Sequence, residues 1–115
     1  MIKLEKKESI YFLTMDAEEN RWNTTFVREI AEALDAIEND EGPGALITSS
    51  TNPKFFSNGL DLDWMQDPES HPKGGDREVF GEEFMYLMGR FITLPIPTIC
   101  AINGHTVGAV FMFDL

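Results

Sequence analysis

Residues 55–62 form the stretch Phe-Phe-Ser-Asn-Gly-Leu-Asp-Leu, on which the interpretation of the whole chain depends. Its single glycine, Gly59, permits a sharp backbone turn that other residues resist. A turn of this kind directly after a strand leaves the next amide, that of Leu60, pointing into a crevice. Asp61 is placed to cap a short helix that begins at Leu62. Taken alone, such a stretch is most often a plain strand-to-helix turn with a capping aspartate.

The chain on both sides of this stretch alternates between β-prone and helical segments. Phe26, Ile30 and Leu34 recur at helical spacing and predict a first helix, with Asn23 or Thr24 as its cap. The order strand, helix, strand favours a parallel pair of strands and an α/β fold. The expected elements are two strands within 2–16, a helix from about 24 that ends before 42, a strand at 45–48, a helix at 76–91, a buried strand at 96–102 and a third helix from about 106.

A second informative stretch, Ala-Ile-Asn-Gly-His-Thr-Val-Gly-Ala, occupies residues 101–109. It follows a predicted strand and opens the third predicted helix, whose first amides have no partner within the helix. Gly108 and Ala109 are small enough for a ligand to approach the backbone, although close packing of helix on strand explains them equally well. Two free amides from two strand-end loops are what an oxyanion hole requires.

Together the two stretches resemble the enoyl-CoA hydratase/isomerase family, also called the crotonase family. Its members carry an aromatic residue, two small or polar residues, Gly, any residue, Asp and Leu, which matches 56–62 here. They also carry Ala-X-Asn-Gly followed by small residues, which matches 101–104 with Gly108 and Ala109. The resemblance implies a crotonase-like α/β spiral of strand-strand-helix repeats. It covers less than half of a family member, so we expect residues 1–115 to be the amino-terminal portion of a truncated domain.

The resemblance also implies roles for particular residues. The backbone amides of Leu60 and Ala109 are expected to form the oxyanion hole that holds the thioester oxygen of an acyl-CoA. Coenzyme A is then part of the substrate, so neither a separate cofactor nor a metal is expected. A full-length form is expected to be a homotrimer. The substrate-binding residues implied are Ser57, Asn58, Gly59, Leu60, Asp61, Leu62 and Ala109.

The reaction that the resemblance implies depends on the general base. Hydratases of the family have a glutamate three residues after the second amide donor, where this chain has Met112. Isomerases place their base further along, in a segment that this chain lacks. The sequence is therefore closest to the Δ3,Δ2-enoyl-CoA isomerases, which shift the double bond of 3-enoyl-CoA to 2-enoyl-CoA in fatty acid β-oxidation. Asp61, Asp63 and Asp114 are the nearby carboxylates that could replace the missing base. Asp61 is better explained as a cap and Asp63 as a solvated side chain.

The alternative to an isomerase is a non-catalytic truncated isoform that binds acyl-CoA weakly or associates with other chains.

For the protein in general, the resemblance implies a peroxisomal or mitochondrial compartment in a eukaryote and a cytoplasmic one in a bacterium. The 115 residues suit one domain, and no secretion signal is visible at the start. Residues 66–76, with two prolines and two glycines, are expected to form a mobile surface loop.

The charge of the chain bears on its partners. Nine Lys and Arg stand against twenty Asp and Glu, a formal net charge of −11, which disfavours nucleic acid and anionic membranes. Coenzyme A is itself anionic, so its phosphates would need local basic side chains. The candidates are Arg21, Lys54, Lys73 and Arg77.

Overall fold

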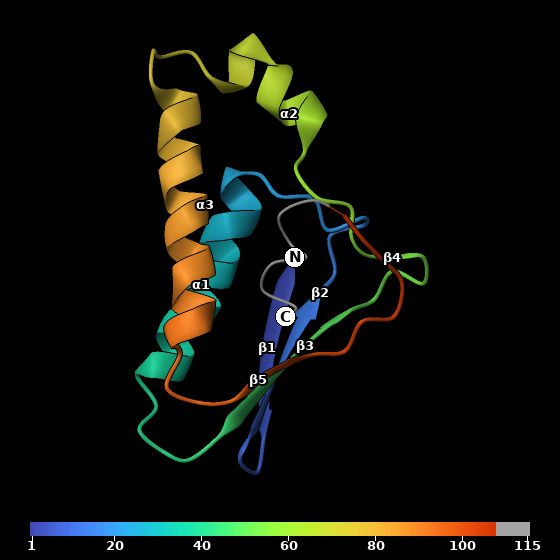
Figure 1. Ribbon diagram of the computed structural model, residues 1–115, viewed down its shortest axis with the longest axis vertical. Coiled ribbons are helices and arrows are strands. Elements are labelled where there is room, and N and C mark those ends of the chain that lie inside the picture. The colour runs from blue at the N-terminus through green and yellow to red at the C-terminus, as the bar shows by residue number, and fades with distance from the viewer. Residues whose placement is uncertain (108–115) are drawn as a thin grey trace.

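The computed structural model describes residues 1–107, which form two successive strand-strand-helix units followed by two short strands (Figure 1). This repeat confirms the predicted α/β class and the order of the expected elements as far as β5. The elements are β1 (Ile2–Lys7), β2 (Ile10–Met15), α1 (Thr24–Glu38), β3 (Ala45–Ser50), β4 (Phe55–Ser57), α2 (Leu62–Gln66), a 3-10 helix η1 (Pro68–Ser70), α3 (Asp76–Thr93), β5 (Thr98–Cys100) and β6 (His105–Thr106).

The strands are divided between two sheets. The larger sheet has the order β1-β2-β3-β5, in which β1 pairs antiparallel with β2 while β3 pairs parallel with both β2 and β5. The parallel pair predicted across the first helix is therefore confirmed. The second strands of the later units, β4 and β6, leave this sheet and pair parallel with each other. The small sheet thus brings together the two stretches that the sequence singled out.

The core lies between the larger sheet and the helices α1 and α3, which cover one of its faces (Figure 1). Asn23 caps α1, because its Oδ1 accepts a hydrogen bond from the Phe26 amide at 2.9 Å. Phe26 and Phe84 then pack edge-on against the buried ring of Trp22, at centroid distances of 4.8 and 5.2 Å. This aromatic contact joins both helices to the loop that precedes α1.

The predictions for the last described segment need two corrections. The strand expected at 96–102 is shorter, since β5 covers only Thr98–Cys100. It is also not buried, since Ile99 is 56% exposed. It lies at the edge of the sheet, and Ile99 pairs with Ile47 on the face that α1 and α3 do not cover. The helix expected from about residue 106 is also wrong at its start. Thr106 belongs to β6, because it pairs with Ser57.

Residues 66–76, expected as a loop, contain more structure than the sequence indicated. The 3-10 helix η1 lies within them, and His71 after it is only 7% exposed. Its ring packs against Trp64 at 4.4 Å, and its Nδ1 lies 3.0 Å from the Asp67 carbonyl oxygen. The mobility of this segment stays a prediction.

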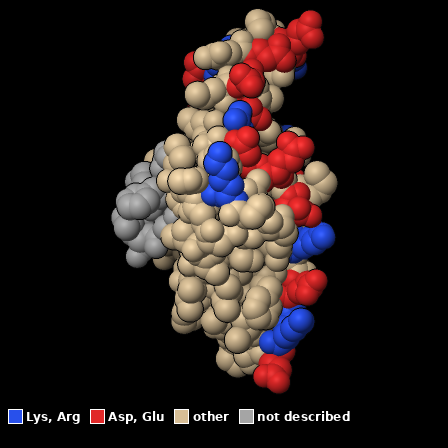
Figure 2. Space-filling model, turned by 90° about the vertical axis from the view of Figure 1, so that its right-hand side faces the viewer, with Lys and Arg blue, Asp and Glu red and all other residues tan. Residues whose placement is uncertain are grey.

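Seen from the side away from the two long helices, charged side chains follow one margin of the molecule beside a broad uncharged area (Figure 2). Within residues 1–107 no helix has both the length and the apolar character needed to cross a membrane. The same part of the chain holds no group of three His, Cys, Asp or Glu side chains arranged to bind a metal. That nucleic acid and anionic membranes are disfavoured stays a prediction from the net charge of −11.

An ionic cluster fastens the β1–β2 hairpin to the end of α1. Lys6 Nζ donates to Asp40 Oδ2 at 2.6 Å, and the Tyr11 hydroxyl donates to the same oxygen. The Gly42 amide lies 3.4 Å from the other carboxylate oxygen. Hydrogen bonds from Lys6, Tyr11 and Gly42 hold the pKa of Asp40 at about 2, below its usual 3.8.

We expect the Asp40→Asn variant to be less stable than the wild type near neutral pH and to approach it in acid. Because the folded-state pKa is depressed, the carboxylate's contribution is complete above about pH 4 and is lost as the pH falls through about 2. Thermal unfolding at pH 7, 4 and 2 measures this difference. Asp63→Asn is the matched control, since Asp63 is almost fully exposed. A Tm difference for Asp40→Asn that persists undiminished at pH 2 would contradict the prediction.

Candidate active site

The stretch 55–62 folds as a strand, a turn and a short helix, in agreement with the sequence. Gly59 makes the turn with a φ of +78°, a value that side chains disfavour. Asp61 caps α2, since its Oδ1 accepts a hydrogen bond from the Trp64 amide at 3.2 Å. The turn therefore presents Leu60 between a strand and a helix.

The Leu60 amide is held in a defined direction by the segment around Trp22. The Trp22 amide donates to the Gly59 carbonyl at 2.8 Å, and the Asp61 amide donates to the Trp22 carbonyl at 2.9 Å. In such a parallel bridge, the residues on either side of Leu60 face the partner, so its own N–H points the other way. No acceptor within residues 1–107 takes that N–H. Among residues 1–107 the Leu60 amide therefore has no partner, and its role as an oxyanion-hole donor stays a prediction.

The second stretch runs directly beside the first. The His105 amide donates to the Lys54 carbonyl at 2.8 Å, and the Val107 amide donates to the Ser57 carbonyl at 3.0 Å. The approach continues to the turn, since a Cβ on Gly59 would lie 2.9 Å from the Val107 carbonyl oxygen. Ala109 lies outside the described residues, so the second oxyanion-hole donor stays a prediction.

Asn103 and Gly104 hold the second stretch against the first. The Asn103 side chain donates to the Asn52 carbonyl at 2.9 Å and ties the second stretch to the loop after β3. Gly104 lies flat against the backbone of Lys54, where a Cβ would be 2.3 Å from the carbonyl oxygen. The pair therefore fixes how closely β6 approaches β4.

The predicted substrate-binding side chains divide into two kinds. Ser57 is buried, and its hydroxyl donates to the Asn20 carbonyl at 2.7 Å while accepting from the Gly59 amide at 3.3 Å. The Asn58 side chain donates to Glu19. Leu60 and Leu62, by contrast, expose apolar side chains next to the free amide. The first kind builds the turn, whereas the second offers an apolar surface, and their contact with substrate stays a prediction.

The carboxylates near the turn are otherwise engaged or solvated. Asp61 uses its second oxygen to accept a hydrogen bond from the Asn23 side chain at 3.1 Å, which supports the predicted capping role. Asp63 is exposed and lies 4.0 Å from Arg21. Arg21 also pairs with Glu19 at 3.2 Å. Asp114, a third sequence candidate for the base, lies outside the described residues.

The remaining basic candidates are partly committed to contacts of their own. The Lys54 ammonium lies 5.3 Å from the centre of the Phe55 ring. The Arg77 side chain donates to the Met65 carbonyl at 2.7 Å, whereas at Lys73 the backbone amide, and not the ammonium, donates to Asp76 at 2.9 Å. Lys54 directly precedes β4, so it is the basic residue closest in sequence to the predicted site.

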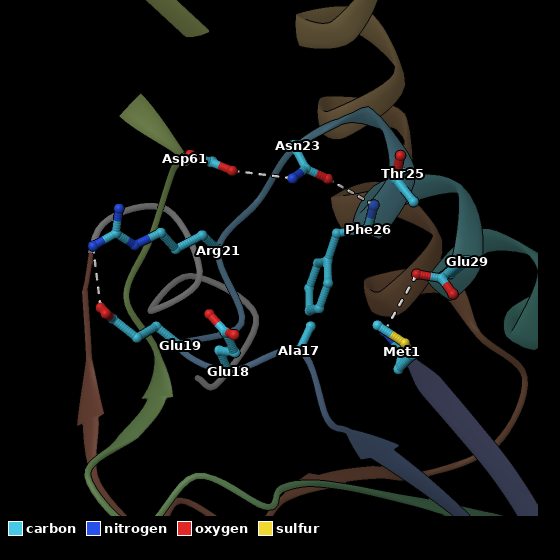
Figure 3. Close-up of a pocket in the computed structure, with 10 residues that line it drawn as sticks. All are labelled: Met1, Ala17, Glu18, Glu19, Arg21, Asn23, Thr25, Phe26, Glu29 and Asp61. Carbon is cyan, nitrogen blue, oxygen red and sulfur yellow. Dashed lines mark hydrogen bonds and ion pairs between the residues drawn. The ribbon is translucent and has the colours of Figure 1, made fainter. Parts of the chain in front are cut away.

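A hollow of about 450 Å³ opens beside the turn (Figure 3). Its charged groups are the carboxylates of Glu18, Glu19, Glu29 and Asp61, opposed by Arg21 and the N-terminal ammonium. The lining residues are Met1, Ala17, Glu18, Glu19, Arg21, Asn23, Thr25, Phe26, Glu29 and Asp61. Because carboxylates predominate, this hollow is a poor receptor for phosphate groups.

We expect Ser57→Ala to destabilise the protein by about 1–3 kcal/mol, because it leaves the buried Asn20 carbonyl and Gly59 amide without their partner. Urea unfolding measures the loss. Ser70→Ala is the control, since Ser70 is exposed and its hydroxyl donates to Asp67, three residues away. Equal effects of the two substitutions would contradict the prediction.

Comparisons with known proteins identify the family to which the two stretches point. Residues 5–115 match the family model described as Enoyl-CoA hydratase/isomerase. The peroxisomal enoyl-CoA delta isomerase 2 of Arabidopsis thaliana is 32% identical over the whole chain, and the peroxisomal enoyl-CoA delta isomerase 1 is 34% identical over 95% of it. The chain covers 49% and 44% of these relatives, so it spans about half the length of the curated relatives it matches.

Solved structures show the same fold. A crystal structure of an enoyl-CoA hydratase from Geobacillus kaustophilus superposes with a TM-score of 0.87 at 24% identity, over 99% of this chain and 44% of that one. An enoyl-CoA hydratase/isomerase from Xanthobacter autotrophicus gives a TM-score of 0.82 at 28% identity, over 97% of this chain and 42% of that one. The predicted crotonase-like fold is thereby confirmed for the part of those folds that this chain covers.

Proposed function

Because this chain belongs to the enoyl-CoA hydratase/isomerase family, we propose that it supplies the oxyanion-hole portion of an enzyme acting on acyl-CoA thioesters. The observation that carries the proposal is the Leu60 amide, which points away from Trp22 and finds no acceptor within residues 1–107. The second stretch, running beside this turn as far as Val107, supports a second donor at Ala109. We propose residues 1–115 as the amino-terminal portion of a crotonase-like domain.

The proposed reaction moves a double bond from position 3 to position 2 of the acyl chain. A base removes a proton from the carbon next to the thioester, and the electron pair shifts onto the thioester oxygen. The Leu60 and Ala109 amides stabilise that oxygen while it carries negative charge. The enolate then regains a proton two carbons along, which leaves the double bond conjugated with the thioester.

Isomerisation is favoured over hydration by two features. The relatives named above carry the name enoyl-CoA delta isomerase. Met112 stands where the resemblance places the hydratase glutamate, and a thioether does not accept a proton at neutral pH. The base would come from a segment beyond these 115 residues. By the same relatives we propose a peroxisomal setting for a plant or other eukaryotic source, and the homotrimer stays an expectation from resemblance.

The test supplies a full-length form of the protein with 3-enoyl-CoA and, separately, with 2-enoyl-CoA. We expect the first to be converted to the conjugated thioester and the second not to be hydrated. Rapid hydration of 2-enoyl-CoA without any double-bond shift would show that the isomerase assignment is wrong.

Met112 also favours the second candidate, a non-catalytic chain that binds acyl-CoA weakly or associates with other chains. Calorimetric titration of the 115-residue chain with an acyl-CoA, alongside the assay, separates the two candidates. Binding without turnover supports the non-catalytic candidate for this chain. Absence of binding at millimolar acyl-CoA, together with a larger assembly in size-exclusion chromatography, supports the associating form.

A further inference from the structure

We propose that Asn20 is a positioning residue for the oxyanion hole, because its buried side chain fixes the turn that aims the Leu60 amide. The inference rests on the proposed function for its catalytic meaning. It concerns a residue of the loop before α1, which lies outside both stretches that the sequence singled out.

Asn20 is completely buried and adopts a left-handed conformation, with a φ of 53°. Asparagine tolerates this conformation better than most residues with a side chain. Its Oδ1 accepts from the Ala17 amide at 2.9 Å, while its Nδ2 donates to Ser50 Oγ at 2.7 Å and to the Phe56 carbonyl at 3.0 Å. One side chain therefore joins its own loop to the end of β3 and to β4.

The backbone of Asn20 continues this connection to the turn. The Ser57 hydroxyl donates to the Asn20 carbonyl and accepts from the Gly59 amide. On one side of Asn20, the Asn58 amide donates to the Glu19 carbonyl at 2.8 Å. Residues 19–23 thus run alongside 57–61, with the Trp22–Leu60 bridge between them. The buried Asn20 side chain anchors this pairing to β3 and β4.

The positioning matters because an oxyanion-hole donor acts only at hydrogen-bonding distance from the developing charge. A misplacement of about 1 Å is enough to cost about 10²-fold in rate. The Leu60 amide has no acceptor of its own within residues 1–107, so its direction is set by the bonds of its neighbours. Loosening residues 19–23 should therefore change where the amide points more than how tightly the acyl-CoA is bound.

The first test is amide hydrogen exchange of the 115-residue chain with Asn20→Gly, which removes the side chain but keeps the left-handed backbone accessible. We expect exchange within 57–61 to become at least tenfold faster while α3 stays protected. Asn39→Ala is the matched control, since Asn39 lies exposed at the far end of α1. Unchanged exchange within 57–61 would overturn the inference.

Asn20→Asp keeps the inference testable if the glycine variant fails to fold. It retains the acceptor for the Ala17 amide but places an oxygen against the Phe56 carbonyl, so we expect faster exchange within 57–61 here too. Protection within 57–61 equal to that of the wild type would count against the inference.

The second test follows the thioester carbonyl itself. Infrared spectra of carbonyl-labelled 2-enoyl-CoA bound to the protein report hydrogen bonding as a shift to lower frequency. We expect the wild type to produce the shift and Asn20→Gly to lose most of it, with the dissociation constant changed by less than about threefold. A full shift in the glycine variant would assign Asn20 a purely structural role. Absence of a shift in the wild type would instead refute the proposed oxyanion hole, while the exchange data still decide whether Asn20 holds the turn.

Discussion

The Gly104→Ala variant is expected to lose the pairing of β6 with β4 and to unfold well before the wild type in urea. A methyl group at this position would lie 2.3 Å from the Lys54 carbonyl oxygen and 2.6 Å from its carbon. Both atoms belong to the backbone, so the clash is relieved only if the strands separate. Overpacking of this kind costs about 1–3 kcal/mol, and the strand hydrogen bonds lost with it add about 1 kcal/mol each. The total is a large fraction of the 5–15 kcal/mol typical of a domain.

Gly89→Ala is the matched control for this prediction. Gly89 lies within α3, and nothing in the described structure lies within 4 Å of a Cβ built there. Alanine in a helix interior is favoured over glycine by about 0.5–1 kcal/mol, so this variant should be slightly more stable than the wild type. A urea midpoint for Gly104→Ala equal to that of the wild type would show that the strands yield without cost.

The elements that the sequence predicts well are those specified by nearby residues. Asn23 marks the start of α1 through a bond to an amide three residues on, and the apolar spacing from Phe26 defines its buried face. Gly59 and Asp61 specify the turn and the cap of α2 in the same local way. The interactions that specify these elements join residues only a few positions apart, so a single sequence is enough to recognise them.

The region around β5 and β6 was predicted less well because partners distant in sequence decide it. An apolar run such as 96–102 indicates a strand but not how much of it another layer covers, and Ile99 proves to be exposed. Thr106 is drawn into a strand by Ser57, whereas the sequence around it suggested the start of a helix. Tertiary pairing overrides local propensity at Thr106, whereas at Ile99 the strand is present and only its burial differs from the prediction.

In the candidate site, too, features set by nearby residues were predicted and those set by distant partners were missed. The free Leu60 amide was predicted, because a glycine turn after a strand is a local signal. The contribution of Asn20 was missed, since residues 16–23 show only a polar, loop-like composition. Its side-chain partners Ser50 and Phe56 lie 30 and 36 residues away. A buried asparagine in a loop of mostly polar residues has no signature in one sequence.

Trp22→Ala is expected to destabilise the protein by about 3–5 kcal/mol, the usual cost of truncating a fully buried aromatic side chain. Trp22 is 0% exposed and contacts the rings of Phe26 in α1 and Phe84 in α3, so its removal leaves a cavity where these helices meet the loop. Urea unfolding gives the loss directly. Trp64→Ala is the matched control, because Trp64 is only partly buried and should cost less.

The effect should extend to the candidate site, because the same residue holds Leu60 through its backbone. The Trp22 amide and carbonyl bond to Gly59 and Asp61, and the buried ring fixes where that backbone lies. Truncation should therefore accelerate amide exchange at 59–61 even in conditions where the protein remains folded. Trp22→Phe, which keeps an aromatic ring in the same place, should restore most of the protection. If Trp22→Ala costs no more than Trp64→Ala and leaves exchange at 59–61 unchanged, the ring does not support the turn.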